Sequence, residues 1–276
     1  MRVLVVGMGS IGRRHATNLA AMGHSIVACD PSFKPQSLNE TFDYRHVKTM
    51  EEGLSQKPDA VFVCSPPALH YEHVRAALQT DCHVFCEKPI ALDIFSAIRL
   101  EEYRRIADHH GVFAVGYMLR ALPELIELKN RLGGPVMGNC HRADITCHWS
   151  RPAPASYEWP GVLEETSHEC DLGLYLFGPC RQVEVVTLTD HDAVFYAQHD
   201  RCPTVRYDLK SDSPRYSRGI YTVTDRLTDN LRYTPEQIEP CYKAEVEAFL
   251  KGEPLCTGGE GLTVVRFIQQ IKEAAK

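Results

Sequence analysis

Five short stretches hold the polar side chains and glycines best placed for chemistry, because each directly follows an apolar run. In chain order they are residues 7–12, Asp30, residues 65–67, residues 87–89 and residues 117–120. Lys88 is the one amine among them. A lysine beside a bound cofactor can hydrogen-bond a substrate hydroxyl and take or give its proton. The alternative is a surface lysine that forms a salt bridge at the end of a strand.

A second polar group lies on a predicted helix over residues 162–177. Glu164, His168, Asp171 and Tyr175 are spaced at i, i+4, i+7 and i+11, so they share one helix face. Histidine changes charge near neutral pH, and one surrounded by carboxylates is suited to proton transfer opposite Lys88. The solvated side of an ordinary helix shows the same kind of polar stripe, so both interpretations stay open.

The glycines of the first stretch have the spacing of a phosphate-binding turn. The apolar run of residues 3–6 predicts a buried parallel strand that leads into it. In this spacing Gly7 makes a tight turn, Gly9 lets the backbone approach a diphosphate, and Gly12 lets the next helix pack closely on the strand. The N–H groups at the start of that helix would face the anion. The pattern predicts a dinucleotide site; a related nucleotide, or a turn that has lost its ligand, is the alternative.

Asp30 bears on which dinucleotide would bind. It ends the second apolar run, residues 25–29, where an acidic side chain would bind the ribose hydroxyls of the adenosine half. A carboxylate repels a 2′-phosphate, so Asp30 favours NAD over NADP. Arg13 and Arg14 could each reach such a phosphate, and they leave NADP open.

Alternating strands and helices must position these residues in the first part of the chain. Buried strands are predicted at residues 3–6, 25–29, 59–64, 83–86 and 111–117, with a short extended piece at 46–48. Helices are predicted between them, the longer ones at residues 70–79 and 93–109. This alternation predicts an α/β, doubly wound parallel sheet of the Rossmann type over residues 1–119. Ligands bind at the carboxyl ends of such strands, where the five stretches lie.

The pattern changes in residues 120–276, which we assign to a second, α+β domain. A helix is predicted at residues 122–132, and residues 136–149 alternate like a long antiparallel strand. Further strands are predicted at residues 182–189, 193–199, 204–209 and 219–224, and helices at 241–251 and 261–275. The second domain is therefore predicted to be a mostly antiparallel sheet with helices on one side. Whether the last helix packs back on the first domain is left open.

Composition and charge exclude several classes of function. The chain has 276 residues, a net charge of −6 and 44% hydrophobic residues, as expected for a globular protein without general attraction to nucleic acid or anionic membrane. The first strand begins too early for a signal peptide and no apolar run could span a membrane, so a cytoplasmic location is expected. Eleven scattered cysteines favour reduced thiols. Zinc binding by the pairs 140–141 and 147–148 is disfavoured, since neighbours on a strand face opposite ways, and no metal is expected.

These motifs together resemble the Gfo/Idh/MocA family of NAD(P)-dependent dehydrogenases, named after glucose-fructose oxidoreductase, inositol dehydrogenase and a rhizopine-catabolism protein. The resemblance is carried by the glycine turn with Arg13-Arg14-His15, by Cys64-Ser-Pro-Pro67 with His70, by Glu87-Lys88-Pro89, by Gly116-Tyr-Met-Leu-Arg120 with Pro123, and by the helix that bears His168 and Asp171. It spans residues 1 to about 178 and implies hydride transfer between a nicotinamide and a hydroxyl or keto carbon of a sugar, cyclitol or nucleotide sugar.

The resemblance also implies roles for individual residues. Lys88, His168 and Glu164 would be catalytic, with Lys88 helping to deprotonate the reacting hydroxyl and His168 as the main acid/base or its partner. The cofactor would contact Gly7, Gly9, Ser10, Ile11, Gly12, Asp30, Cys64, Ser65, Pro66, His70, Glu87 and Lys88. The substrate would contact Lys88, Arg120, Glu164, His168 and Asp171.

Two departures from the family pattern bear on these roles. The family usually has Asp four residues before the histidine, where this chain has Glu164. The second domain is short for the family, and we expect some of its strands to be abbreviated or lost. A homo-oligomer, dimer or tetramer, is expected through that sheet. Two alternatives stay open: a non-redox enzyme that recycles its NAD within one turnover, and a binding protein for NAD or sugar that has lost catalysis.

Overall fold

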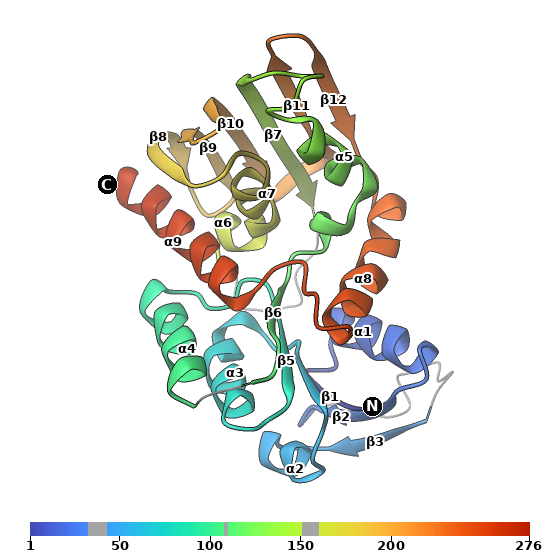
Figure 1. Cartoon of the computed structure of the whole chain (residues 1–276). Coiled ribbons are helices and arrows are strands. Elements are labelled where there is room, and N and C mark those ends of the chain that lie inside the picture. The colour runs from blue at the N-terminus through green and yellow to red at the C-terminus, as the bar shows by residue number, and fades with distance from the viewer. Residues whose placement is uncertain (33–42, 108–109, 151–159) are drawn as a thin grey trace. The chain divides into compact units, whose positions relative to one another are not determined.

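The structure is a computed structural model that describes residues 1–32, 43–107, 110–150 and 160–276 (Figure 1). The chain folds into two compact units. Unit 1 consists of Met1–Tyr117 and Tyr242–Leu262, and unit 2 consists of Met118–Cys241 and Thr263–Lys276. Two long helices cross the boundaries, because α8 (Pro235–Leu250) ends in unit 1 and α9 (Gly258–Ala274) begins there. The sequence-based division at residues 119 and 120 stays a prediction.

Unit 1 is built on a parallel sheet of six strands in the order β3-β2-β1-β4-β5-β6. The strands are β1 (Arg2–Val6), β2 (Ser25–Cys29), β3 (Tyr44–Val47), β4 (Ala60–Val63), β5 (His83–Glu87) and β6 (Phe113–Gly116). The connections contain α1 (Ser10–Ala21), α2 (Met50–Ser55), the short 3-10 helix η2 (Pro67–Leu69), α3 (His70–Leu78) and α4 (Ile94–Ile106). The predicted doubly wound parallel sheet is confirmed, with the order of strands reversing beside β1.

The apolar strands explain why this sheet forms the core of unit 1. All four residues of β4 and residues 3–5 of β1 are completely buried, as parallel strands are when helices cover both faces of the sheet. The returning segment 242–262 adds to the same core, because the ring of Phe249 packs edge-on against Phe62 and Phe85, at 5.3 and 5.5 Å between centroids. It also approaches the sheet edge, where Val115 N donates to Cys256 O.

Unit 2 is built on a second six-stranded sheet in the order β12-β11-β7-β10-β9-β8. Its strands are β7 (Cys140–Ser150), β8 (Cys180–Leu188), β9 (Asp192–His199), β10 (Cys202–Lys210), β11 (Asp212–Thr224) and β12 (Thr228–Arg232). Only the pair β7–β10 is parallel, so the prediction of a mostly antiparallel sheet is confirmed. The helical segments before these strands are the 3-10 helix η3 (Met118–Ala121) and α5 (Pro123–Arg131), and α6 (Val162–Glu165) and α7 (Ser167–Phe177) lie between β7 and β8.

One face of this sheet is covered by helices α7 and α9. The side chain of Phe267 in α9 packs on Phe195 and Tyr207 of the sheet, at 6.1 and 5.8 Å between centroids. In α7, a Cβ at Gly173 would lie 1.7 Å from the Tyr207 hydroxyl, so only glycine allows the helix to pack this closely. The buried residues of β7, β9 and β10 alternate, as expected for strands with one face on a core.

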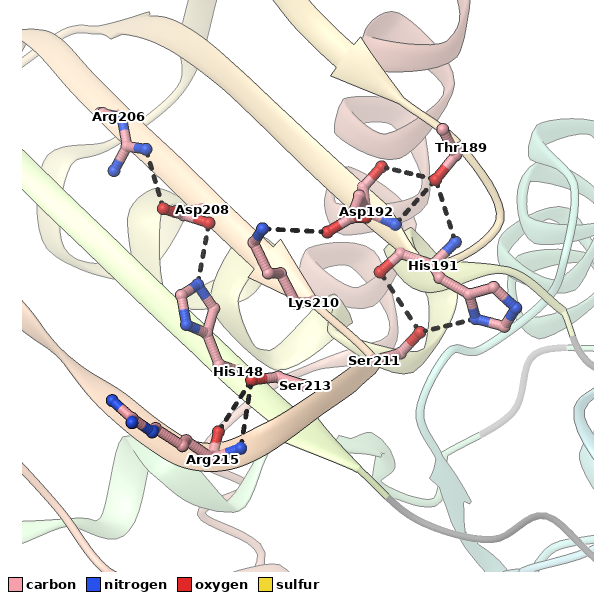
Figure 2. Close-up of polar contacts among 10 residues, drawn as sticks. All are labelled: His148, Thr189, His191, Asp192, Arg206, Asp208, Lys210, Ser211, Ser213 and Arg215. Carbon is pink, nitrogen blue, oxygen red and sulfur yellow. Dashed lines mark hydrogen bonds and ion pairs between the residues drawn. The ribbon is translucent and has the colours of Figure 1, made fainter.

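The other face of this sheet carries a network of polar contacts across the strands, part of which is shown in Figure 2. Asp208 accepts from Arg206 and contacts Nε2 of His148, both at 2.8 Å, and Lys210 pairs with Asp192 at 3.4 Å. The alternation of faces also separates the residues of the zinc alternative. Cys140 and Cys147 are buried, whereas His141 contacts Asp225 and His148 contacts Asp208.

The predicted single helix over residues 162–177 is wrong in one respect, because it is broken at Thr166. This residue has φ −96° and ψ 24°, outside the helical range, and it ends α6 and begins α7. Its hydroxyl donates to the carbonyl of Val162, which satisfies the end of the first helix. Glu164 and His168 therefore lie on two different helices, and their predicted i, i+4 relation does not hold.

Of the helices in the described ranges, none is long and apolar enough to cross a membrane. No disulfide joins any of the eleven cysteines, all of which fall within those ranges.

Candidate active site

The glycine turn of unit 1 has the shape that a diphosphate requires. Gly7 has φ +90°, a conformation that disfavours other residues, and its N–H donates to Cys29 O at 2.8 Å. A Cβ at Gly12 would lie 1.8 Å from the carbonyl oxygen of Gly7, so helix α1 can approach β1 only with glycine there. A Cβ at Gly9 would meet no atom within 4 Å, which leaves open space at the start of the helix.

This open space lies at the N-terminus of α1. Gly9 precedes Ser10 and Ile11, the first turn carries no acidic side chain, and no side chain caps it. Uncapped N–H groups at the positive end of a helix dipole are a ready site for an anion. The residues present therefore fit the diphosphate of a dinucleotide.

Asp30 is held beside this turn by two backbone contacts. Its Oδ2 accepts from Met8 N at 2.9 Å, and its Oδ1 accepts from Ser32 N at 2.8 Å. The first contact ties the end of β2 to the glycine turn, which follows β1. The carboxylate predicted to bind ribose hydroxyls thus has a fixed orientation next to the predicted phosphate site.

His70 joins the turn after β4 to the turn after β5. Its Nε2 lies 2.8 Å from Ser65 O and its Nδ1 lies 2.7 Å from Pro89 O, and the ring is buried. Burial lowers the pKa of His70, and the two carbonyl contacts oppose this in part. Because both ring nitrogens face protein carbonyls, His70 holds the two turns together in this structure. Its contact with the cofactor stays a prediction. Cys64 and Ser65 are buried beside it, and Pro66 is exposed.

Glu87 and Lys88 end β5 at the same edge of the sheet. Oε1 of Glu87 lies 2.7 Å from Nε2 of His15 in α1, and both side chains are buried. Lys88 N donates to Oε2 of Glu87 at 3.3 Å, and the Lys88 side chain is half-buried. The turn that carries the predicted catalytic lysine is thereby linked to the helix that begins at the phosphate site.

In unit 2 the predicted substrate residue Arg120 is paired with Asp171. Nε and Nη2 of Arg120 donate to the two carboxylate oxygens of Asp171 at 3.0 and 2.7 Å. The side chains are 6% and 1% exposed, so this is a buried, bidentate pair. The guanidinium also lies 5.0 Å from the ring centroid of Tyr175, and Nζ of Lys129 lies 3.4 Å from the same ring.

The carboxylates near His168 are also neutralised within unit 2. Glu164 pairs with Lys272 at 2.5 Å, and Glu169 pairs with Arg218 at 2.5 Å. The pKa of Arg218 is raised by its contact with Glu169, although burial opposes the shift. His168 itself is 6% exposed. The predicted residues Arg120, Glu164, His168 and Asp171 are therefore all buried in unit 2, and the three charged ones among them are held in ion pairs.

Three cations that contact these side chains, and one more buried acid in unit 1, were not predicted from the sequence. The cations are Lys272, Arg218 and Lys129, and the acid is Glu245 of α8. A signal for Glu245 was present in the sequence. Cys241, Glu245 and Phe249 are spaced at i, i+4 and i+8, so Glu245 shares a helix face with two apolar residues. A carboxylate on the apolar stripe of a helix indicates a specific partner. Lys272 and Arg218 themselves had no comparable local signal.

A family model matches the first part of the chain. Residues 1–117 match the model of the Gfo/Idh/MocA oxidoreductases, which describes an oxidoreductase family with an NAD-binding Rossmann fold. These residues are therefore similar to the NAD-binding domain of that family. The predicted resemblance is confirmed, and the residues of the glycine turn lie within the matched range.

The curated relatives of this chain include dehydrogenases. The myo-inositol 2-dehydrogenase of Thermotoga maritima is 31% identical over 186 residues, which are 64% of this chain and 55% of that protein. The D-glucoside 3-dehydrogenase of Escherichia coli is 36% identical over 98 residues, 33% of this chain and 28% of that protein. The chain thus spans about half the length, or less, of these curated relatives.

One solved structure is similar in fold to this protein over the whole chain. The WlbA dehydrogenase of Bordetella pertussis, solved with NADH and UDP-GlcNAcA, has a TM-score of 0.87 and 20% identity, with 100% of this chain and 95% of that chain covered. At this identity the likeness shows the fold alone. The expectation that strands of the second domain are abbreviated or lost stays a prediction.

Proposed function

We propose that this protein is an NAD(P)-dependent oxidoreductase that transfers a hydride between the nicotinamide and a hydroxyl or keto carbon of a sugar, cyclitol or nucleotide sugar. The observation that carries the proposal is the geometry around the glycine turn. Open space at Gly9, the uncapped start of α1 and the fixed carboxylate of Asp30 adjoin each other, and Lys88 follows a strand of the same sheet. A dinucleotide bound there accepts or donates the hydride.

The chain's own residues have separable roles in this proposal. The glycine turn binds the diphosphate, and Asp30 binds the ribose hydroxyls and thereby favours NAD over NADP. Lys88 hydrogen-bonds the reacting hydroxyl and receives its proton during oxidation. His168 is the acid/base of unit 2, and Arg120, Asp171 and Glu164 hold its surroundings through ion pairs, of which Arg120–Asp171 is buried.

The substrate class is proposed from the relatives and from the chemistry of the site. The amine of Lys88 and the imidazole of His168 are groups that can hydrogen-bond a hydroxyl. The named relatives act on inositol and glucosides, and the WlbA structure holds a nucleotide sugar. These substrates share a ring carbon that bears a secondary hydroxyl, which is the group that we propose is oxidised.

The test is a panel of cyclitols, sugars, sugar acids and UDP-sugars, each with NAD or NADP, with the absorbance of the reduced cofactor as readout. We expect turnover with NAD on at least one member, and a loss of about 10²-fold or more in kcat for Lys88→Met. Lys243→Met, an exposed lysine paired only weakly with Glu247 at 3.8 Å, is the matched control. Full activity of Lys88→Met would refute its role.

Two other outcomes would favour the alternatives. Conversion of a substrate without net change in the redox state of the cofactor would identify an enzyme that recycles its hydride. Tight NAD binding without conversion of any panel member, and unchanged by Lys88→Met or His168→Asn, would identify a binding protein.

We also propose that the protein forms a homo-oligomer through the polar face of the second sheet. This face carries the cross-strand ion pairs of Figure 2, and Tyr196 and Tyr221 are 38% and 36% exposed. Tyrosines with a polar rim are typical of interfaces. Light scattering on the wild type and on Tyr196→Lys tests the assembly, and a monomeric wild type would contradict it.

We further propose a cytoplasmic location. The absence of disulfides among the eleven cysteines favours a reducing compartment, the cytoplasm.

A further inference from the structure

Three ionisable side chains meet in the core of unit 1. They are His15 of α1, Glu87 at the end of β5 and Glu245 of α8, with 0%, 8% and 3% of their surfaces exposed. One nitrogen or oxygen atom of each lies within 4.8 Å of the others. Glu87 and Glu245 are far apart in the sequence, and the segment 242–262 brings them together.

The surroundings of this cluster are mainly aromatic. The ring of His15 lies 5.5, 5.3 and 6.2 Å from the ring centroids of Phe62, Phe85 and Tyr242. The guanidinium carbon of Arg14 lies 4.6 Å from the centroid of the Tyr242 ring. Burial raises the pKa of the Cys64 thiol most, and Glu87 and Glu245 raise it further; Glu87 likewise adds to the effect of burial on the pKa of Cys86.

Only one of the two carboxyl groups has a hydrogen-bond donor among the described side chains. Glu87 accepts from His15 at 2.7 Å. Oε1 of Glu245 is completely buried and has no hydrogen-bond partner within the described residues. A buried carboxylate without a donor is costly, and two carboxylates that share a site of low polarity do not both ionise.

A proton on Glu245 removes both costs. The neutral acid gains an O–H donor, and the carboxylate of Glu87 is the nearby acceptor. Burial raises the pKa of Glu245, and the negative charge of Glu87 raises it further, in agreement with this geometry.

We propose that Glu245 is a neutral carboxylic acid that donates a hydrogen bond to Glu87, so that Glu87 is held by donors from α1 and from α8. Glu245 is then a positioning residue for the turn of Glu87, Lys88 and Pro89. The protonation state of Glu245 is independent of the proposed function, whereas its effect on turnover rests on it.

A divalent cation is the competing occupant of this cluster. Two ligand atoms bound to one ion at about 2.1 Å each are separated by about 3 Å or more. The 2.7 Å between His15 and Glu87 is instead the distance of a direct hydrogen bond. The structure therefore favours a shared proton over an ion.

The first test detects the proton without any turnover. Infrared difference spectra of the purified wild type against Glu245→Gln, at neutral pH, should show one protonated carboxyl C=O band that the variant lacks. Glu247→Gln on the same helix, at a half-buried position paired with Lys243, is the control and should keep the band. Identical spectra of the wild type and Glu245→Gln would overturn the proposal.

The second test uses rescue by a neutral donor. The amide of Glu245→Gln can still donate to Glu87, whereas Glu245→Met cannot. We expect Glu245→Gln to keep kcat within about twofold and Glu245→Met to lower kcat about tenfold with KM for the cofactor little changed, because a displaced turn misplaces Lys88. Equal losses in both variants would show that the negative charge is needed and would refute the proposal.

The pH dependence of stability distinguishes a protonated Glu245 from a Glu245 that has a purely structural role. A glutamate that is neutral in the folded chain contributes stability below its ordinary pKa of 4.5, which is lost as pH rises through the folded pKa. Glu245→Gln should therefore gain stability relative to the wild type as the pH rises above about 4.5. Zinc or manganese that co-purifies with the wild type in a one-to-one ratio, and is absent from Glu245→Gln, would establish the cation instead.

Discussion

The guanidinium of Arg120 binds both carboxylate oxygens of Asp171, at 3.0 and 2.7 Å, although the residues are 51 positions apart. Arg120 lies in η3, and Asp171 lies one turn after His168 in α7. The pair therefore fixes α7 against the short helix that follows β6 in the chain. Arg120 and Asp171 were both predicted to bind substrate, but in the structure they form an ion pair with each other. This pair orients the helix that carries the proposed acid/base.

Arg120→Met should destabilise the protein by about 3 kcal/mol, because it leaves the carboxylate of Asp171 buried without its cation. The free energy of unfolding in urea measures this. The double variant Arg120→Met with Asp171→Leu should recover much of the loss, since no uncompensated charge remains. A double variant as unstable as the single one would contradict an ion-pair role.

Gly12→Ala and Gly9→Ala should separate folding from cofactor binding. A Cβ at Gly12 would overlap the carbonyl oxygen of Gly7 at 1.8 Å, so Gly12→Ala should lower the melting temperature of the cofactor-free protein. A Cβ at Gly9 meets only open space, so Gly9→Ala should leave that temperature nearly unchanged and weaken NAD binding about tenfold or more. NAD titration by calorimetry, with thermal unfolding, distinguishes the two. Unchanged NAD affinity in Gly9→Ala would place the diphosphate elsewhere.

Lys272→Met should destabilise the protein, because it removes the cation that the last helix supplies to the buried carboxylate of Glu164. The Glu164 side chain is 4% exposed, and Lys272, which is 39% exposed, contacts its carboxylate. Loss of this cation should cost about 2 kcal/mol, less than for a fully buried pair because water reaches the lysine. Lys272→Arg keeps the charge and is the control. If Lys272→Met unfolds at the same urea concentration as the wild type, the contact contributes nothing measurable.

Acid should destabilise unit 2 through His199. Burial lowers the pKa of this residue below its ordinary 6.5, although its contact with Gly178 O at 2.7 Å opposes the shift. The unfolded chain therefore takes up a proton first, so the stability from His199 is present above about pH 6.5 and is lost as pH falls through the folded pKa. Thermal unfolding from about pH 7.5 to about pH 5 should show a smaller decline for His199→Asn than for the wild type. Parallel declines would assign the acid sensitivity to other groups.

The sequence by itself determined the architecture of unit 1 and the edge of the sheet at which the turn residues meet. Continuous apolar runs such as residues 3–6 and 59–64 can be satisfied only as strands covered on both faces, and the turn residues after them must then meet at one edge. The requirement for glycine at position 12 is equally local, because a Cβ there would meet the carbonyl oxygen of Gly7. For the same reason the antiparallel sheet of unit 2 was visible in the alternation of β7.

Only the tertiary structure decided how the charges of these sites are balanced. Glu164 was predicted from helical spacing, but the helix is broken at Thr166 and the partner of Glu164 is Lys272, 108 residues away. Glu245 reaches Glu87 because the segment 242–262 returns to unit 1. Periodicity indicates which face of an element is buried, because the local backbone geometry fixes the direction of each side chain. The identity of a buried charge's partner depends on packing between distant segments, which no local pattern encodes.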